Sequence, residues 1–331
     1  MLCNASQSKI VLKHALNNQY AILAINADSH AAILDCLEAA LQMDAPVIIE
    51  SSLWQLKGRS FGAGDPILGM SRYISTLAIL ANSDRYLDIP VIYHTDHIKG
   101  PQTMDILGAA IRGINHQYNG HQITQRASTI SLDASEFSEE ENIDHMLSLC
   151  QIAQESEVEV TLEMESAVDD RITDAEETKN LLGSVEEQFP DHIHLWAPGV
   201  GTKHGFGDNM DFDPENVEYQ RKLTREITGR EIGIALHGST GMSADDLTKA
   251  ARAGVVKVKW STESLLIRSE AAREYYSHSE KFDKQHPDWK NTVMDNGINT
   301  YISKIYLPKV QQRIKVLNGD GKASDAMKFL G

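Results

Sequence analysis

The chain has few cysteines, and this scarcity excludes two kinds of architecture. Its 331 residues include three cysteines, Cys3, Cys36 and Cys150, which are far apart and odd in number. That pattern is a poor framework for disulfides and a poor cysteine metal site. We therefore expect a protein of the reducing cytoplasm.

Long apolar runs and positive charge are also in short supply. No segment is long enough to span a bilayer, and the opening stretch MLCNASQSKIVLKHAL lacks the apolar centre of a signal peptide. The formal net charge of −16 argues against a surface that neutralises nucleic-acid phosphates. It is compatible with a local cationic pocket for a small anionic substrate. We expect no membrane partner and no nucleic-acid partner.

The chain is rich in alternating short apolar runs and longer amphipathic runs. Helical patterns include residues 31–43, 104–114, 139–154, 174–187 and 243–253. The predicted strands are residues 21–26, 46–50, 90–94, 129–132, 158–163, 192–196, 233–236 and 255–258. About eight strand–helix units in one series are typical of a closed parallel barrel.

An open, doubly wound sheet is the rival architecture, and it carries a glycine-rich turn after its first strand. Here the first strand runs into Asn26-Ala27-Asp28-Ser29, which has no such turn. We therefore predict an α/β fold, a (β/α)₈ TIM barrel, in one domain over residues 1–331. The barrel is expected over about 8–278 and a C-terminal helical extension over about 279–331. The extension either caps the barrel or builds an oligomer contact, and we expect a homodimer or higher homo-oligomer.

Polar residues gather where the predicted strands end, which is where barrel enzymes carry their reactive groups. His97, His204 and His237 follow three different strands, and each lies beside a small residue or close to one. Any one histidine among 13 is more often a core or surface residue than a ligand. Three at separate strand ends, joined by a carboxylate, suit a zinc-type catalytic site with one open position.

Several of these segments together resemble the class II, metal-dependent fructose-bisphosphate aldolases, and the chain looks like a divergent member of that family. The similarity covers most of the chain, in the family's order. The matching motifs are His94-Thr95-Asp96-His97 for HxDH, Ser131-Leu132-Asp133-Ala134-Ser135 with Glu140-Glu141-Asn142, Glu163-Met164-Glu165 for E-x-E, Gly201-Thr202-Lys203-His204-Gly205, His237-Gly238-Ser239-Thr240-Gly241 for HGGSG, and Gly254-Val255-Val256-Lys257.

The resemblance implies a role for each matched residue. His97, His204 and His237 would hold Zn²⁺ or another divalent cation, with Glu165 as a fourth ligand or its neighbour. A monovalent cation is a further expectation. Asp96 would move the hydroxyl proton, and Asp133 would orient a ligand histidine or the substrate. Substrate contacts are implied at Asn26, which falls where the family has an active-site asparagine, and at the backbone of Gly205, Gly238, Ser239, Thr240 and Gly241.

The chain departs from the family after the eighth strand. The family reads N-x-D-(T/S) there, whereas this chain reads Lys259-Trp260-Ser261-Thr262. Lys259 stands where an amide is expected. Its ammonium would either form a structural ion pair with Glu165 or Asp133, or bind an oxyanion or acidic group of the substrate; imine formation is a third alternative. Ser261 and Thr262 remain candidate substrate contacts.

Two loops also differ. The family's glycine-rich loop with a proton-shuttling glutamate is replaced by a shorter stretch in which Asp169 or Asp170 would do that work or is simply solvated. After the second strand, Lys57 and Arg59 would receive a distal phosphate, sulfonate or carboxylate, or are surface charges. No clear counterpart of the family's C-terminal phosphate-gripping arginine is found. Fructose 1,6-bisphosphate is therefore a doubtful substrate.

The leading functional hypothesis is a carbon–carbon lyase acting on a phosphorylated or otherwise anionic ketose, through an enediolate whose charge a divalent cation takes up. One alternative is a non-catalytic aldolase-like subunit. Another is a barrel enzyme that uses the same metal for other carbonyl chemistry, such as an epimerisation, a dehydration or a transaldol-type transfer.

Overall fold

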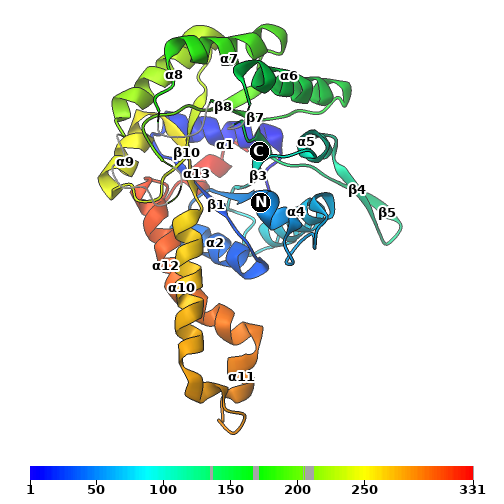
Figure 1. Cartoon of the computed structure of the whole chain (residues 1–331), viewed down its shortest axis with the longest axis vertical. Coiled ribbons are helices and arrows are strands. Elements are labelled where there is room, and N and C mark those ends of the chain that lie inside the picture. Colours follow the sequence, from blue (N-terminus) through cyan, green and yellow to red (C-terminus); the bar gives the residue numbers. More distant parts are fainter. Residues whose placement is uncertain (135–136, 167–170, 204, 206–211, 331) are drawn as a thin grey trace.

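A closed parallel barrel forms the body of the molecule (Figure 1). The computed structural model describes residues 1–134, 137–166, 171–203, 205 and 212–330. Within these ranges eight strands close in the order β1-β10-β9-β8-β7-β6-β3-β2. They are β1 (Ile22–Asn26), β2 (Val47–Ser51), β3 (Val91–Ile98), β6 (Thr129–Leu132), β7 (Leu162–Glu165), β8 (Ile193–Ala197), β9 (Gly233–Leu236) and β10 (Val255–Trp260). Each predicted strand overlaps one of them, so the predicted fold class is confirmed.

Helices surround the barrel (Figure 1). The helices between strands are α2 (His30–Met43), α3 (Leu53–Lys57), α4 (Pro66–Ala81), α5 (Thr103–Arg112), α6 (Glu139–Glu155), α7 (Ala175–Gln188), α8 (Pro214–Thr228) and α9 (Ala244–Ala253). Before the first strand, α1 (Ala5–Asn17) packs its apolar side chains against inward residues of the strands, among them Ile22, Ile48 and Ile92. Helix α1 therefore closes the end of the barrel where the strands begin, and the end where the strands finish is left for an active site.

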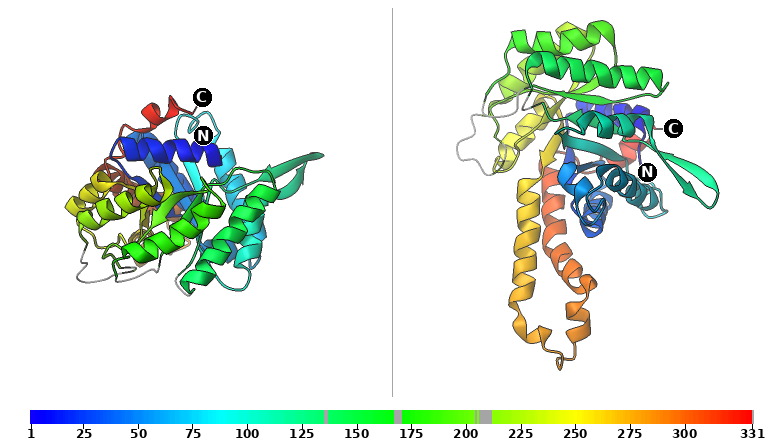
Figure 2. Two further views of the ribbon diagram at one scale, coloured as in Figure 1. Left: turned by 90° about the horizontal axis from the view of Figure 1, so that it is seen from above. Right: turned by 45° about the vertical axis from the view of Figure 1, so that its right-hand side comes forward.

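The C-terminal segment forms a long arm that projects away from the barrel (Figures 1 and 2). Helix α10 (Thr262–Ser277) runs outward, and η1 (Ser279–Phe282) and α11 (Trp289–Val293) lie at the tip. Helix α12 (Asp295–Val316) returns along α10 and packs against α2, and α13 (Ala323–Met327) ends the chain against α1. The expected helical extension is therefore present. The division expected near residue 278 falls at the end of α10, and the single-domain assignment stays a prediction.

A β-hairpin that the sequence analysis missed projects from the barrel between α5 and β6 (Figure 2). Its antiparallel strands are β4 (Ile114–Tyr118) and β5 (His121–Gln125). Asn119 and Gly120 join them with φ angles of 50° and 81°, as a type I′ turn requires. The Asn-Gly pair between two short strands was the available signal.

Two further expectations bear on the cysteines and on membranes. Cys3, Cys36 and Cys150 are free and buried, and burial raises the pKa of each thiol to about 12. No helix in the described ranges combines the length and apolar character needed to cross a membrane.

Candidate active site

A bulge at the end of β3 places two neighbouring functional side chains on one side. Consecutive residues of a regular strand face opposite sides of the sheet. Here the register with β6 shifts between Thr95 and Ile98, and His97 has a φ of 47°, a left-handed conformation that costs a non-glycine residue about 1–3 kcal/mol. The bulge re-aims His97, whose Nε2 lies 3.7 Å from Oδ1 of Asp96. Both side chains line the cavity at the barrel mouth.

Three side chains at this mouth fit a divalent cation. His97, Glu165 and His237 come from β3, β7 and the end of β9, and one ligand atom of each lies within 4.8 Å of the other two. Both oxygens of Glu165 are buried and accept no hydrogen bond from the described residues, so the carboxylate has capacity for an ion. Imidazole with carboxylate is a zinc-type donor set. His204, the remaining predicted ligand, lies outside the described residues.

His237 is held from below by a carboxylate that the sequence analysis did not single out. Its Nε2 lies 2.9 Å from Oε1 of Glu163. Burial alone would raise the pKa of Glu163, but Lys257 and His94 lower it to about 2. An ionised carboxylate only accepts hydrogen bonds, so Nε2 of His237 carries the proton and Nδ1 carries the lone pair of the ring. Such a carboxylate–histidine pair orients a ligand and increases its basicity.

Glu163 belongs to a fully buried charged layer beneath the mouth. Nζ of Lys257 lies 2.7 Å from Oε2 of Glu163, 2.9 Å from Oε1 of Glu50 and 2.7 Å from Nε2 of His94. Glu50, His94 and Asp96 also have ligand-type geometry, but the ammonium of Lys257 already supplies the cation. The sequence analysis missed Glu50, His94, Glu163 and Lys257 as a group. Their signal was the strand period of two, because Glu163 and Lys257 each precede a site residue by two positions.

Lys259 contacts Asp96, the candidate acid/base residue. Its ammonium forms an ion pair with Oδ1 of Asp96 and lies 3.7 Å from Oε1 of Glu165. Asn26 donates a 2.8 Å hydrogen bond from Nδ2 to Oδ2 of the same aspartate. Burial opposes the charge of Asp96, but Lys259 and His97 hold the pKa of that carboxyl well below its usual range. Burial alone would lower the pKa of Lys259; Asp96 and Glu165 raise it instead. Asp96 is therefore a carboxylate and Lys259 a cation.

Two further residues hold the ends of neighbouring strands. Asp133 lies after β6, with Oδ2 3.9 Å from Nδ1 of His97 and 3.5 Å from Nζ of Lys99. Asn142, at the start of α6, donates a 2.8 Å hydrogen bond to the carbonyl of Glu165. Asp133 thus lies beside a ligand histidine, where an orienting role was expected. Asn142 fixes the backbone that presents Glu165.

A cavity of about 760 Å³ opens above these groups. Leu53 and Trp54 give part of its wall an apolar character, and the Trp54 side chain is 87% exposed. Arg59 and Gly241 do not line it, and Asp169 and Asp170 lie outside the described residues. The predicted substrate residues that do line it are Asn26, Lys57, Gly205, Gly238, Ser239, Thr240, Ser261 and Thr262.

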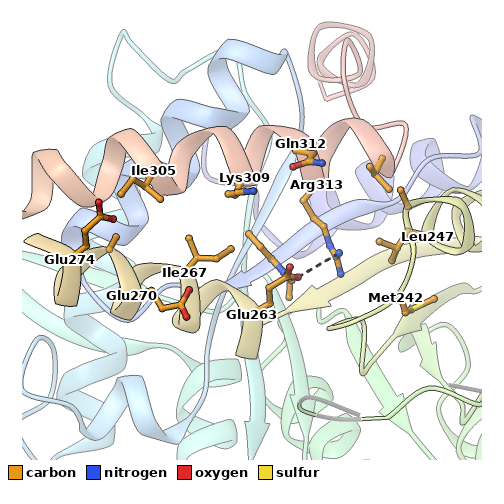
Figure 3. Close-up of a pocket in the computed structure, with 14 residues that line it drawn as sticks. Met242, Leu247, Glu263, Ile267, Glu270, Glu274, Ile305, Lys309, Gln312 and Arg313 are labelled. Atoms are coloured by element: carbon orange, nitrogen blue, oxygen red, sulfur yellow. Dashed lines mark hydrogen bonds and ion pairs between the residues drawn. The ribbon is translucent and has the colours of Figure 1, made fainter. Parts of the chain in front are cut away.

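The loop after β9 is held from behind by the arm. Arg313 of α12 donates from Nη2 to the carbonyl and to Oγ of Ser239, at 2.6 and 2.9 Å. Its guanidinium also lies 3.7 Å from Glu263 and over the ring of Trp260. Figure 3 shows Arg313 and Glu263 in a second cavity, of about 550 Å³, between α10, α12 and the start of α9. A residue far along the chain therefore supports the loop that faces the substrate cavity.

A parallel barrel with imidazoles, carboxylates and a lysine at its open end has the donor groups of a barrel enzyme that binds a divalent cation. The family model "Fructose-bisphosphate aldolase class-II" matches residues 6–322. The chain therefore belongs to the class II fructose-bisphosphate aldolase family, and it is an aldolase-type lyase.

Individual relatives are distant. A fructose-bisphosphate aldolase of Ureaplasma parvum is 28% identical over 274 residues, which is 81% of this chain and 83% of that protein. The crystal structure of fructose-bisphosphate aldolase from Campylobacter jejuni superposes with a TM-score of 0.79 at 22% identity, covering 97% of each chain. The YdjI aldolase of Escherichia coli K12 gives a TM-score of 0.70 at 20% identity, over 98% of this chain and 100% of that one. Because both structures are less than 25% identical to this chain, their similarity shows only a shared fold.

Proposed function

We propose that this chain is a divalent-metal-dependent aldolase that cleaves or forms a phosphorylated or otherwise anionic ketose other than fructose 1,6-bisphosphate. The observation that carries the proposal is the group His97, Glu165 and His237, with ligand atoms within 4.8 Å, beside Asp96 at the cavity mouth. His204 would complete the ligand set. When bound, the divalent cation, Zn²⁺ or another, supplies a Lewis acid for negative charge that develops on the cleaved ketose.

The side chains divide the remaining work. Asp96, as a carboxylate, accepts the hydroxyl proton of the substrate in the cleavage direction and returns it in synthesis. Asn26 keeps Asp96 in place through its 2.8 Å hydrogen bond. The backbone amides from Gly238 to Thr240 face an anionic substituent. Asp169 or Asp170 remains the proposed carrier of the carbon-bound proton.

The wall of the cavity supports a substrate other than the bisphosphate. Lys259 brings a buried cation to the place where the family has an amide, which favours an additional acidic or oxyanionic group close to the reacting carbons. Leu53 and Trp54 bring apolar surface to the same cavity. Lys57, at the end of α3, is the proposed contact for a distal anion, and Arg59 is a candidate beyond it. A monovalent cation near the substrate anion remains a further proposal.

A retro-aldol screen of metal-loaded protein tests this function. Purified protein would be analysed for bound metal, treated with EDTA, and assayed with a panel of ketose phosphates that includes fructose 1,6-bisphosphate, before and after Zn²⁺ is restored. We expect two carbonyl fragments from a ketose other than the bisphosphate, loss of turnover on chelation and recovery with metal. If EDTA treatment left turnover unchanged, the metal-dependent mechanism would be refuted. If fructose 1,6-bisphosphate had the highest kcat/KM of the panel, the substrate proposal would be refuted.

The ion pair between Lys259 and Asp96 motivates a second candidate, an aldolase-like subunit without activity of its own. In that case Lys259 neutralises the acid/base permanently. Co-purification with an active homologous chain, and no turnover with any ketose, would favour it. Product analysis by NMR separates both candidates from an epimerase or a transaldol-type enzyme, because a simple aldolase releases two carbonyl fragments.

We further propose that the protein is a cytoplasmic homodimer or larger homo-oligomer. Free, buried thiols suit a reducing compartment. The tip of the arm exposes large apolar side chains, among them Tyr276, Val293 and Met294 at 59, 45 and 50%, and such surface often marks a contact. Light scattering after size exclusion would test this, and a monomer at micromolar concentration would contradict it.

A further inference from the structure

The ammonium of Lys259 lies among the candidate metal ligands themselves. Its Nζ is 2.9 Å from Nε2 of His97 and 3.7 Å from Oε1 of Glu165, and it forms an ion pair with Asp96. The side chain is 6% exposed. A cation of the chain is thus already in place where the family's divalent cation would be held.

The contact between Lys259 and His97 is incompatible with a metal on either nitrogen of that imidazole. A metal bound to Nε2 of His97 would lie about 2 Å from that nitrogen, in the space that Nζ of Lys259 occupies at 2.9 Å. A metal bound to Nδ1 would require the proton on Nε2, which then points at the three N–H groups of Lys259. In both cases the lysine must leave.

The charges in the site lead to the same conclusion, that Lys259 must leave when the metal binds. Asp96 and Glu165 are both nearly fully buried, at 4 and 2% exposure, and buried carboxylates need a compensating cation. Without metal, Lys259 is that cation. With metal, a doubly charged ion and the ammonium would lie within a few ångströms of each other, and in a poorly solvated site their repulsion is strong.

We propose that Lys259 is a displaceable internal cation: it holds the metal-free site together, competes with the divalent cation for His97, and swings into the substrate cavity when the metal binds. The proposal rests on the metal dependence proposed above. Lys259 already lines the cavity together with Ser261 and Asn26, so the released ammonium becomes available to an anionic group of the substrate only in the metal-loaded state.

Metal affinity provides the first test. Zn²⁺ and Co²⁺ binding would be measured by competition with a chromophoric chelator for the wild type, Lys259→Met, Lys259→Asn and Lys259→Arg. We expect Lys259→Met and Lys259→Asn to bind about 10- to 100-fold more tightly, the size expected for removing one like charge a few ångströms from the ion. Lys259→Arg should stay close to the wild type. Lys222→Met removes an exposed charge of α8, far from the site, and should change affinity less than about threefold.

Labelling and stability provide the second test, which does not depend on turnover. Reductive methylation with peptide mass spectrometry should modify Lys259 slowly in EDTA-treated wild type and faster after Zn²⁺ loading. In EDTA, Lys259→Met should unfold at a lower temperature than Lys259→Arg, and Zn²⁺ should narrow that gap.

The outcomes separate this proposal from the proposed function. Unchanged or weaker metal binding in Lys259→Met, or equal labelling of Lys259 with and without metal, would overturn the displaceable cation while a metal-dependent wild type still supported the aldolase. If neither the wild type nor any Lys259 variant binds metal, both proposals fail.

Discussion

The imidazole of His237 owes its orientation to the Glu163 carboxylate beneath it, 2.9 Å away. We predict that Glu163→Gln lowers Zn²⁺ affinity about 10- to 100-fold, the usual effect of losing such a partner. The NH₂ of the glutamine can donate to Nε2 of His237 and favour the tautomer with its proton on Nδ1. The substitution also removes one of the buried carboxylates that pair with Lys257. Chelator competition on the purified variant would measure the change.

A matched control for that variant is Glu187→Gln, which removes an exposed carboxylate of α7 and should leave metal affinity within about twofold. Circular dichroism would establish that both variants are folded. Equal Zn²⁺ affinity in Glu163→Gln and Glu187→Gln would show that the pair does not orient the ligand.

At the scale of elements, the loop after β9 depends on a glycine. Gly238 has a φ of 66°, and a Cβ there would lie 2.5 Å from the backbone oxygen of Lys203. Gly238→Ala should therefore push apart the loop that carries His237 and the backbone of Lys203. We predict a loss of at least about 2 kcal/mol in the free energy of unfolding, together with weaker metal binding. Urea titration and chelator competition would measure the two effects.

Gly321→Ala is the control for backbone strain alone. Gly321 has a similar φ of 68°, but nothing lies within 4 Å of its added Cβ. Gly321→Ala should lower the free energy of unfolding by about 1 kcal/mol and leave metal affinity unchanged. If the two alanine variants behaved alike, the close approach to Lys203 would have no importance for the site.

The arm acts on the same loop through Arg313. We predict that Arg313→Gln raises KM for the anionic ketose, and the Kd of inorganic phosphate, by about tenfold, because charged hydrogen bonds that hold Ser239 are lost. The kcat should change less, since Arg313 touches no residue proposed to move protons. Lys309→Gln, which removes a charge from the same cavity of Figure 3, should leave KM within about twofold. A loss in kcat with KM intact would argue against loop positioning.

At the scale of the whole molecule, one buried histidine links folding to pH. His194 of β8 has its pKa lowered to about 4 by burial, with Lys9 and Arg230 acting in the same direction. The unfolded chain takes up this proton near pH 6.5, whereas the folded chain resists it down to about pH 4. His194 therefore contributes stability above about pH 6.5 that is lost as the pH falls toward 4.

Urea unfolding of the wild type and of His194→Gln between pH 4 and 7 would measure this contribution. The difference in unfolding free energy between the two should change by up to about 1.4 kcal/mol per pH unit over that window. His121→Gln, which alters an exposed histidine of the hairpin, should follow the wild type. A pH-independent difference between His194→Gln and the wild type would contradict the assignment.

Local pattern alone determined the barrel, all eight strands, the helical extension and the polar residues at the strand ends. The reason is that strand and helix periods and the Asn-Gly, capping and motif signals act over a few residues, and parallel strands necessarily bring their ends together. Even the missed hairpin had a local signal.

Only the tertiary structure decided which of those polar groups touch. The bulge that turns His97 toward Asp96, the pairing of Lys257 with Glu50 and Glu163, and the reach of Arg313 to Ser239 join residues from distant parts of the chain. The choice of Asp96 and His97 as partners of Lys259 is of the same kind. Ion pairing in a buried site depends on distances of a few ångströms between side chains, and no spacing along the sequence specifies those distances.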